Sequence, residues 1–510
     1  MNNSIRVRFA PSPTGPLHIG GLRTALFNYL FAKKNNGSFI LRIEDTDKNR
    51  YTAGSEEHIV NSLKWCGLEP DESPFNPGRH GPYRQSERGE MYKKAIQELI
   101  DKKRAYYAFD TKEDLEKHRY EHEKKGLVFS YNYENRKTLK NSLSLGEKEV
   151  SKMIDSGEPY VIRFKAPVNK TIVCEDVLRG SVSVNSNIID DKILYKSDGM
   201  PTYHFANVVD DMAMEITHVI RGEEWLPSLP LHWMIYDAFE CLKKPLFVHL
   251  PLILKPEGKG KLSKRDGEKF GFPVYATSWK EKNKEEIKGY RELGYLPVSV
   301  VNFLSLLGWN PGNEKEIFCL SELINEFDFK GLNKSGARFD PEKNKWFNHC
   351  HIQKTENNVF ESMINEEFKE AHKTYNNEQT NKIIELVKPR LETLYDLSRV
   401  CGFFYIDPVV FSEKSLKNFK NINSIEILNS VAVLLENKKD QENLKENLRV
   451  LSKEKDWGFG KVLGLLRISV VGDLSGPDLF EIISLIGGET CVKRVLSLIS
   501  FLEKKQKHSG

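Results

Sequence analysis

Two segments that lie far apart in the chain constrain its fold more than any other feature of the sequence. They are Arg8–Gly21, which reads RFAPSPTGPLHIGG, and Lys261–Arg265, which reads KLSKR. An apolar stretch over residues 5–9 leads into the prolines of the first segment, and apolar residues recur at helical spacing from Leu22 onward. The sequence therefore predicts a short strand, a rigid loop and the N-terminus of a helix.

The loop before this helix is suited to hold phosphate. A helix N-terminus presents unpaired N–H groups and the positive end of the helix dipole to an anion. Gly20 and Gly21 let a ligand come close to the backbone, and His18 can donate a hydrogen bond to a phosphoryl oxygen. The alternative is a proline-rich turn before an ordinary amphipathic helix, with His18 on the surface. The polar residues Arg8 and Ser12 argue against a loop that only packs.

The second segment is a cationic loop with glycines on both sides. It follows an apolar run over residues 249–254, which predicts a strand. Lys264 can act as a point charge on an α-phosphate as negative charge builds up there. The alternative is a solvated basic loop, as most Lys/Arg runs are. Together the two segments indicate an ATP site and an adenylate-forming enzyme.

These two segments resemble the signature motifs of the class I aminoacyl-tRNA synthetases, with His18–Gly21 in the place of HIGH and Lys261–Arg265 in the place of KMSKS. More specifically, the chain resembles the bacterial glutamyl-tRNA synthetases. Five blocks carry this resemblance: RFAPSPTG from Arg8, ILRIEDTD from Ile40, GPYRQSER from Gly81, KSDGMPTYHFANVVDD from Lys196 and VIRGEEW from Val219. The resemblance is strong over residues 1–350 and weaker beyond them.

The resemblance implies an α/β fold of Rossmann type, with an α+β insertion that binds the tRNA acceptor end and all-α domains after it. We expect the first half of the Rossmann domain at residues 1–85, the insertion at 86–204 and the second half of the Rossmann domain at 205–255. A KMSKS-type loop with a stem-contact helical domain is expected at 256–340, and two helical anticodon-binding domains at 341–398 and 399–510. The charged segment 273–290 has no role that the sequence reveals.

Glutamate carries two carboxylates and one ammonium, so its pocket needs at least two arginines and a carboxylate. By similarity to the family, the glutamate-binding residues are Arg8, Ser12, Glu44, Tyr203, Asn207 and Arg221. We expect Arg8 to take the side-chain carboxylate and Glu44 to take the ammonium. The expected ATP-binding residues are His18, Gly20, Gly21, Glu224, Trp225, Lys261, Ser263, Lys264 and Arg265, with His18 and Lys264 catalytic.

ATP is expected as a substrate with Mg²⁺. The acidic residues Glu44, Asp45 and Asp47 could alternatively form an acidic turn or a Mg²⁺ site. Some family members hold zinc through cysteines, but here Ala108 and Asp110 stand at those positions and the chain has no Cys-x-Cys pair. We therefore predict no structural zinc.

The composition of the chain indicates in which compartment the protein works and how it can contact tRNA. Seven scattered cysteines suggest reduced thiols in a cytoplasm, and no apolar run is long enough to cross a membrane. The formal net charge of +4 is small, so contacts with tRNA must come from local patches. We expect a cytoplasmic monomer whose partners are tRNA-Glu, L-glutamate and ATP, and we expect bound tRNA to be needed for activation of glutamate.

The helical pattern after residue 341 favours the bacterial type of glutamyl-tRNA synthetase over its relatives. Glutaminyl-tRNA synthetases and archaeal or eukaryotic glutamyl enzymes end in β-barrels, whereas the bacterial glutamyl type ends in helices. Within this part Arg390 resembles the arginine that reads the last anticodon base; the alternative is an exposed helix arginine. A glutaminyl-tRNA synthetase, or a glutamyl enzyme that also charges tRNA-Gln, remains the nearest alternative function. A small-molecule nucleotidyltransferase with the same His-x-Gly loop is the alternative from another class.

Overall fold

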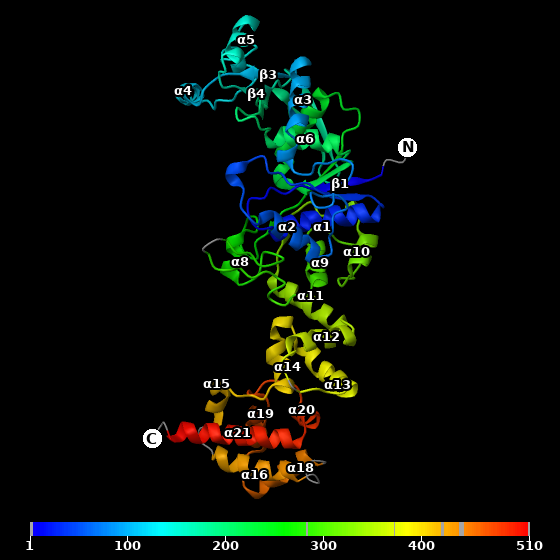
Figure 1. Ribbon diagram of the computed structural model, residues 1–510, viewed down its shortest axis with the longest axis vertical. Coiled ribbons are helices and arrows are strands. Elements are labelled where there is room, and N and C mark those ends of the chain that lie inside the picture. The colour runs from blue at the N-terminus through cyan, green and yellow to red at the C-terminus, as the bar shows by residue number, and fades with distance from the viewer. Residues whose placement is uncertain (1–3, 282–283, 372, 420–422, 438–442, 508–510) are drawn as a thin grey trace. The chain divides into compact units, whose positions relative to one another are not determined.

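The fold was analysed in a computed structural model of the 510-residue chain, which describes residues 4–281, 284–371, 373–419, 423–437 and 443–507 (Figure 1). The chain divides into two compact units. Unit 1 comprises Met1–Glu292 and Pro297–Asn344, and unit 2 comprises Leu293–Leu296 and Lys345–Gly510. Each unit is described by itself below.

Unit 1 is built on a six-stranded sheet with the order β2-β1-β8-β9-β5-β6. The strands are β1 (Arg6–Phe9), β2 (Ser38–Leu41), β8 (His218–Gly222), β9 (Leu246–Leu250), β5 (Thr171–Asp176) and β6 (Gly180–Asn185). Neighbouring strands are parallel except β5 and β6, which form an antiparallel hairpin. The β1 and β8 strands are almost entirely buried, as expected where helices cover a parallel sheet. The predicted Rossmann-type α/β architecture is confirmed.

Helices surround this sheet. Helix α1 (Ile19–Lys34) contacts β1, β2 and β8, and α7 (Leu229–Ala238) contacts both β5 and α6 (Tyr203–Ala213). Helix α1 is apolar over most of its length because it also packs on α9 (Pro297–Leu306) and α10 (Leu320–Glu326). Helix α2 (Ser55–Trp65) and the short α8 (Lys264–Phe270) complete the surroundings of the two signature segments.

The segment 86–204 contributes to two sheets rather than one. Strands β3 (Ala105–Ala108), β4 (Val161–Phe164) and β7 (Ile193–Tyr195) form a separate antiparallel sheet, accompanied by α3 (Gly89–Asp101), α4 (Lys112–Glu123) and α5 (Glu147–Asp155). Between β4 and β7 the chain forms the β5–β6 hairpin, which joins the large sheet through the pair Asp176↔Phe247. Part of the expected insertion therefore belongs to the sheet that carries the site.

In the charged segment 273–290, the described residues 273–281 and 284–290 lie antiparallel to each other. Trp279 and Ile287 face each other in an antiparallel bridge, and the Tyr290 amide donates a hydrogen bond of 3.0 Å to the Tyr275 carbonyl. These residues pack on α2, where the Trp279 ring lies edge-on to His58 with ring centroids 5.4 Å apart. Strands β10 (Ile253–Leu254) and β11 (Ala337–Arg338) form a two-stranded sheet of their own.

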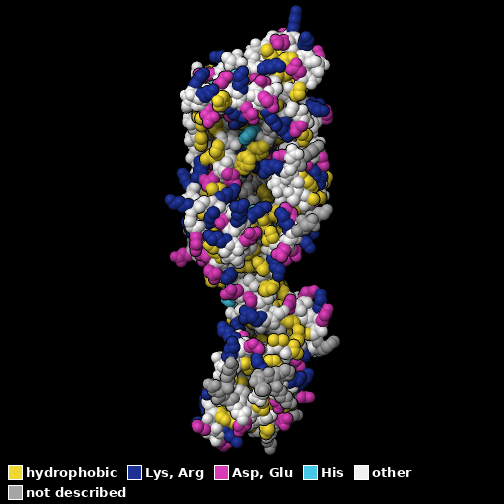
Figure 2. Space-filling view, turned by 90° about the vertical axis from the view of Figure 1, so that its left-hand side faces the viewer, with side chains coloured by type: hydrophobic (Ala, Val, Ile, Leu, Met, Phe, Trp, Pro, Cys, Tyr) yellow, Lys and Arg dark blue, Asp and Glu magenta, His cyan; other side chains and the backbone are white. Residues whose placement is uncertain are grey.

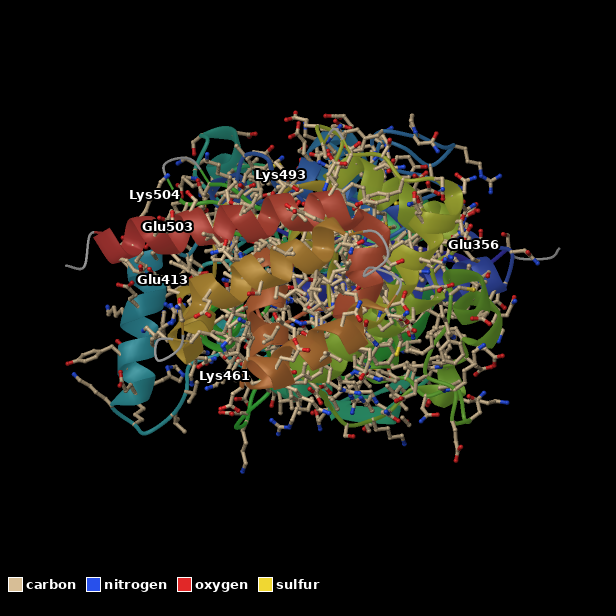
Figure 3. The ribbon with its side chains drawn as sticks, turned by 90° about the horizontal axis from the view of Figure 1, so that it is seen from below. Glu356, Glu413, Lys461, Lys493, Glu503 and Lys504 are labelled. Atoms are coloured by element: carbon tan, nitrogen blue, oxygen red, sulfur yellow. The ribbon has the colours of Figure 1, made fainter. Side chains whose placement is uncertain are left out.

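Unit 2 is helical. Its first helices are α12 (Asn357–Glu367), α13 (Asn377–Val387) and α14 (Leu397–Tyr405); they follow α11 (Pro341–Lys354), within which the division between the units falls. The remaining helices are α15 (Glu413–Leu416), α16 (Ser424–Glu436), α18 (Leu444–Glu454), α19 (Phe459–Val471), α20 (Leu479–Ile486) and α21 (Gly488–Lys507). Helix α21, which carries Lys493 and Lys504, packs against α16 (Figure 3). No strand occurs among the described residues of unit 2, and the predicted helical C-terminal part is confirmed.

Candidate active site

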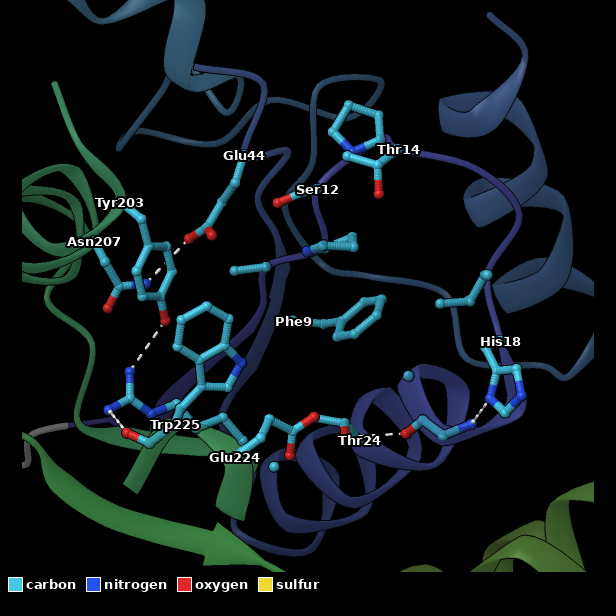
Figure 4. Close-up of a pocket in the computed structure, with 18 of the residues that line it drawn as sticks. Phe9, Ser12, Thr14, His18, Thr24, Glu44, Tyr203, Asn207, Glu224 and Trp225 are labelled. Atoms are coloured by element: carbon cyan, nitrogen blue, oxygen red, sulfur yellow. Dashed lines mark hydrogen bonds between the residues drawn. The ribbon is translucent and has the colours of Figure 1, made fainter. Parts of the chain in front are cut away.

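A cavity of about 920 Å³ in unit 1 brings the two signature segments together. It is lined by parts of the loop after β1, the residues after β2, the N-terminal part of α6, the end of β8 and the KLSKR segment. Figure 4 shows His18, Glu44 and Tyr203 among the lining residues. The predicted residues on its wall are Arg8, Ser12, His18, Gly20, Gly21, Glu44, Tyr203, Asn207, Arg221, Glu224, Trp225, Lys261, Ser263 and Lys264.

Two predicted site residues lie elsewhere. Arg265 is exposed and does not line the cavity. The side chain and backbone amide of Ser263 both bond to the Asp266 carboxylate, so Ser263 caps α8, which begins at Lys264. Arg390, predicted to bind the anticodon and not to line this cavity, belongs to unit 2.

His18 is the N-cap residue of α1, and this role fixes its tautomer. Its Nδ1 accepts a hydrogen bond of 3.1 Å from the Gly20 amide, so the proton of the neutral ring is on Nε2. Nε2 is buried and makes no hydrogen bond of normal geometry to any described residue, although the Ser263 backbone is close enough to act on the pKa of His18. Burial, together with the nearby charges of Lys261 and Lys264, lowers the pKa of His18 to about 4. The residue is therefore a neutral donor at physiological pH, with its N–H free for a ligand.

The KLSKR segment lies next to the His18 loop. The Lys264 ammonium is 5.8 Å from the centre of the Tyr275 ring, and it approaches Gly15 so closely that an added Cβ there would lie 3.3 Å from Nζ. Gly15 also has a φ of +140°, which favours glycine. Lys261 forms an ion pair of 2.6 Å with Glu224. The His18 loop and the KLSKR segment, which are the two predicted parts of the ATP site, thus lie side by side in the cavity wall, with Lys264 between them.

The segment after α8 connects the two halves through the backbone. The Ile19 amide, at the start of α1, donates a hydrogen bond of 2.9 Å to the Val274 carbonyl. His18 and Tyr275 form an isolated antiparallel bridge, and their rings meet edge to face. The residues that follow the KLSKR segment therefore hold the start of α1 in place.

Glu44 sits in a buried network that the sequence analysis only partly anticipated. Its carboxylate accepts hydrogen bonds from Asn207 Nδ2 at 3.0 Å and from Arg42 Nη2 at 3.2 Å. Burial raises the pKa of Glu44, although Arg42 and Arg8 act in the opposite direction. Arg8, in turn, bonds to Asp211 through Nε at 3.1 Å. The carboxylate of Glu44 thus has positive charge behind it and a free side toward the cavity.

The sequence analysis missed Arg42, Asp210 and Asp211 as individual residues, although each lies inside a block that was identified. Arg42 bonds to Asp211 at 2.7 Å, and Asp210 accepts from Arg88 Nε at 2.6 Å. Their signal is a charged residue within an apolar run, since a fully buried charge needs a partner. Such pairs are typical of a rigid support beneath a binding pocket.

Arg221 has a different environment from Arg8. Its guanidinium donates to His249 Nε2 at 3.0 Å, to the Tyr203 hydroxyl at 3.1 Å and to the Trp225 carbonyl at 3.3 Å. Within the described parts of the chain, no carboxylate lies within ion-pair distance of it. Arg221 is 5% exposed, so a buried positive charge faces the cavity without a negative partner. That arrangement is suited to bind a carboxylate.

The described residues form no metal-binding cluster at this site. Among the residues that the structure describes, no group of three His, Cys, Asp or Glu side chains could hold a metal ion. The described helices include none with the length and apolar character needed to cross a membrane.

Acidic and basic side chains are interspersed over the face shown in Figure 2, where unit 1 is hollowed.

Comparisons with known proteins agree with this geometry. Residues 4–346 match the family model "tRNA synthetases class I (E and Q), catalytic domain", and residues 360–499 match an "Anticodon binding domain". The glutamate–tRNA ligase of Christiangramia forsetii is 50% identical over 99% of this chain and 100% of its own length, and that of Flavobacterium johnsoniae is 49% identical over 98% and 100%. A crystal structure of a glutamate–tRNA ligase from Elizabethkingia meningosepticum in complex with its amino acid has a TM-score of 0.88, with 48% identity over 98% of this chain and 99% of that one.

The parallel sheet, the capped His18 loop and the Lys264 loop define the catalytic part of a class I tRNA synthetase. The identity over the full length is more specific than the fold. The chain belongs to the glutamate–tRNA ligase family. The family predicted from the motifs and the ligase activity that it implied are therefore confirmed.

Proposed function

We propose that the unit 1 cavity activates L-glutamate with ATP and that the glutamyl group then passes to the 3′ end of tRNA-Glu. One observation carries this proposal: Arg8, Glu44 and Arg221 share a cavity with His18 and Lys264. The first three residues complement the charges of glutamate, and the other two can stabilise charge on a phosphoryl group.

Glu44 is proposed to bind the ammonium of glutamate, because its carboxylate faces the cavity from between Asn207 and Arg42. The sequence alone predicts that Arg8 binds the side-chain carboxylate. The contacts favour Arg221 instead, since Arg8 is already paired with Asp211. The side-chain carboxylate stays ionised throughout the reaction, so it gains most from an arginine without a negative partner.

The α-carboxylate is proposed to lie near Arg8 and Ser12. A paired arginine can orient this group without removing its negative charge, which matters because the α-carboxylate is the nucleophile. One of its oxygens attacks the α-phosphorus of ATP, and the bond from phosphorus to the bridging oxygen breaks as pyrophosphate leaves. No nucleophile from the protein is needed, so catalysis rests on positioning and charge stabilisation.

His18 and Lys264 are proposed to stabilise charge in this step. The free Nε2–H of His18 donates to an oxygen on the α-phosphorus, and the Lys264 ammonium neutralises the phosphate charge that develops there. Mg²⁺ bound to ATP as part of the substrate would screen the negative charge of the departing pyrophosphate. In the second step a ribose hydroxyl of the tRNA attacks the glutamyl carbonyl, and AMP leaves.

The remaining cavity residues are proposed to bind the nucleoside part of ATP. Trp225 presents a 38% exposed indole to the cavity, which is suited to contact a flat base or a substrate chain. Gly21 leaves little room for a side chain, because an added Cβ would lie 2.8 Å from Leu17 Cδ1. We propose that its bare backbone lets ATP come close to the start of α1. Glu224 is paired with Lys261, and both side chains must rearrange if ATP is to bind each of them.

We infer that unit 2 recognises the anticodon of tRNA-Glu and that Arg390 takes part. Arg390 is exposed at the end of a short 3-10 helix, Lys388–Arg390, and burial, with a smaller effect of the Arg390 charge, lowers the pKa of Arg467. An arginine fork can engage the acceptor atoms of cytosine. We further infer a cytoplasmic location from the seven cysteines scattered along the sequence, and a monomer because the residues of unit 1 alone bring the proposed glutamate and ATP sites together.

Pyrophosphate exchange with tRNA-Glu present tests the amino-acid assignment. The wild-type enzyme is expected to support exchange with glutamate, and Arg221→Gln should raise the KM for glutamate by about 10- to 100-fold with little change in the KM for ATP. Lys259→Gln serves as a control, because Lys259 is exposed and lies outside the cavity wall. An unchanged KM for glutamate in Arg221→Gln would remove this residue from the pocket.

A further inference from the structure

Three buried polar side chains form a chain behind the cavity. Arg221 Nε lies 3.0 Å from His249 Nε2, and His249 Nδ1 lies 2.7 Å from Asp176 Oδ2. The three residues come from β8, β9 and β5, which are neighbours in the sheet. His249 is 0% exposed and Asp176 is 3% exposed, so no water competes for these bonds.

Strand register explains why the first two residues meet. Arg221 on β8 is paired directly with His249 on β9, so their side chains point to the same face of the sheet. Asp176 is the last residue of β5 and pairs with Phe247. The contact therefore follows from the order of the three strands and is not a chance approach of flexible side chains.

The hydrogen bonds fix the protonation of each member. An arginine Nε–H can only donate, so His249 Nε2 must accept and the proton of the neutral ring must be on Nδ1. Burial lowers the pKa of His249, in agreement with a neutral ring. Burial alone would raise the pKa of Asp176. Its carboxylate accepts hydrogen bonds from His249 and from the amides of Leu178 and Arg179, and these bonds outweigh burial and lower the pKa.

We propose that Asp176 and His249 are positioning residues for substrate binding: Asp176 selects the His249 tautomer, and that tautomer orients the Arg221 guanidinium toward a glutamate carboxylate. This inference rests on the proposed role of Arg221. The bond to His249 is the shortest that Arg221 makes; those to Tyr203, Trp225 and His232 are 3.1, 3.3 and 3.4 Å. His249 thus restrains Nε through the shortest of these bonds, so a substrate carboxylate would compete only with the longer bonds that Nη1 and Nη2 make.

The proposal gives the β5–β6 hairpin a part in amino-acid recognition. The turn after Asp176 is tied to the cavity rim, because Arg179 bonds to Glu223 at 2.5 Å and Glu223 accepts from the Leu252 amide at 2.9 Å. Leu252 lines the cavity. A segment that the sequence assigns to the acceptor-binding insertion therefore supports both Arg221 and the rim beside it.

Asp176→Asn is the sharpest variant because it preserves the shape of the side chain: Oδ1 can still accept from the Leu178 and Arg179 amides, while an amide nitrogen replaces Oδ2, which accepts from Nδ1 and the backbone amide of His249. The amide would donate to His249 Nδ1, and the ring proton would move to Nε2, where it opposes the Arg221 Nε–H. In the full-length enzyme with tRNA-Glu, we expect the KM for glutamate to rise by about 10- to 100-fold while the KM for ATP stays within about twofold. Glu175→Gln, one residue earlier on β5 and exposed, is the matched control.

Two His249 variants keep the test decisive if Asp176→Asn fails to fold. His249→Gln retains an acceptor for Arg221 and a donor for Asp176, whereas His249→Leu removes both. We expect the KM for glutamate to be near wild type in His249→Gln and raised in His249→Leu. Equal values in the two variants, with both folded by thermal melting, would overturn the proposal.

A spectroscopic measurement reports the tautomer directly. Nitrogen NMR of ¹⁵N-histidine-labelled enzyme should show His249 protonated at Nδ1 in the wild type and at Nε2 in Asp176→Asn. An unchanged tautomer, or an unchanged KM for glutamate in Asp176→Asn, would overturn the positioning role. If Arg221→Gln leaves that KM unchanged as well, the proposed function of Arg221 fails; if only Arg221→Gln raises it, the positioning inference alone fails.

Discussion

The Gly20 backbone amide donates a hydrogen bond of 3.1 Å to Nδ1 of His18, so the residue proposed to contact ATP also caps its own helix. One ring nitrogen serves the fold and the other is left for a ligand. This division explains how a half-buried histidine can remain a donor without carrying a charge.

His18→Asn should separate the two roles of the residue. Asparagine is a good N-cap, so the start of α1 should persist, but no donor reaches the position of Nε2. We expect kcat for pyrophosphate exchange to fall by about 10²- to 10³-fold with little change in Tm. His18→Ala should lose the cap as well, at about 0.5–2 kcal/mol of stability. Wild-type exchange by His18→Asn would show that Nε2 has no catalytic role.

The lowered pKa of His18 predicts a specific dependence of stability on pH. Its pKa is about 4 in the folded protein and ordinarily 6.5, so the unfolded chain binds more protons between these values. The contribution of this residue to stability is therefore complete above about pH 6.5 and is lost as the pH falls toward 4. Thermal melts of the wild type and His18→Asn from pH 4 to 7 measure this; parallel curves would contradict it.

Glu44→Gln should weaken glutamate binding because the ammonium loses its negative partner. We expect a rise of about 10- to 100-fold in the KM for glutamate. Burial raises the pKa of Glu44, so in the wild type binding should weaken as the pH falls through that raised value, earlier than for an ordinary carboxyl group. Asp45→Asn is the control, since Asp45 bonds to Ser86 and does not line the cavity. A flat profile of KM against pH in the acid range would contradict the assignment.

Lys264→Ala should affect the chemical step and spare tRNA binding. The ammonium approaches Gly15 in the His18 loop, and its removal leaves the developing phosphoryl charge without this partner. We expect pyrophosphate exchange to fall by about 10²- to 10³-fold, with tRNA affinity nearly intact. Lys259→Ala, in the same loop but outside the cavity wall, should behave as wild type. Equal exchange rates in the two variants would remove Lys264 from the mechanism.

Much of the site could be predicted because its residues lie in short contiguous motifs. His18 and Lys264 each stand in a signature segment, and the charge of glutamate dictates the need for Glu44 and two arginines. Asp176 and His249 could not be found this way. Their roles depend on the register of β8 with β9 and on the entry of β5 into the large sheet, which are long-range pairings.

For the fold as well, the sequence predicted some elements but not how all of them pair. Periodicity indicated the helices of unit 2, because the apolar residues of an amphipathic helix recur at helical spacing on its buried face; the same spacing from Leu22 onward indicated α1, although α1 is buried on more than one side. The place of the β5–β6 hairpin was not predictable. A strand with alternating burial, such as β5, can pair with either of two sheets, and only the packed structure decides which.

Arg390→Gln should relax the choice of tRNA without changing the activation of glutamate. If the arginine reads an anticodon base, its loss should reduce discrimination between tRNA-Glu and tRNA-Gln by about 1–3 kcal/mol. Arg399→Gln is a suitable control, because Arg399 is exposed in the same unit and pairs with Asp396. An identical ratio of charging rates before and after the change would contradict this role of Arg390.

Aminoacylation of tRNA-Glu and tRNA-Gln with labelled glutamate and labelled glutamine tests the central claim most directly. The charge complement of Arg8, Glu44 and Arg221 predicts that wild-type enzyme attaches glutamate to tRNA-Glu and attaches glutamine to neither tRNA at a comparable rate. Attachment of glutamine at an equal or greater rate would contradict the account, because the buried charge of Arg221 would then lack the carboxylate that it is proposed to bind.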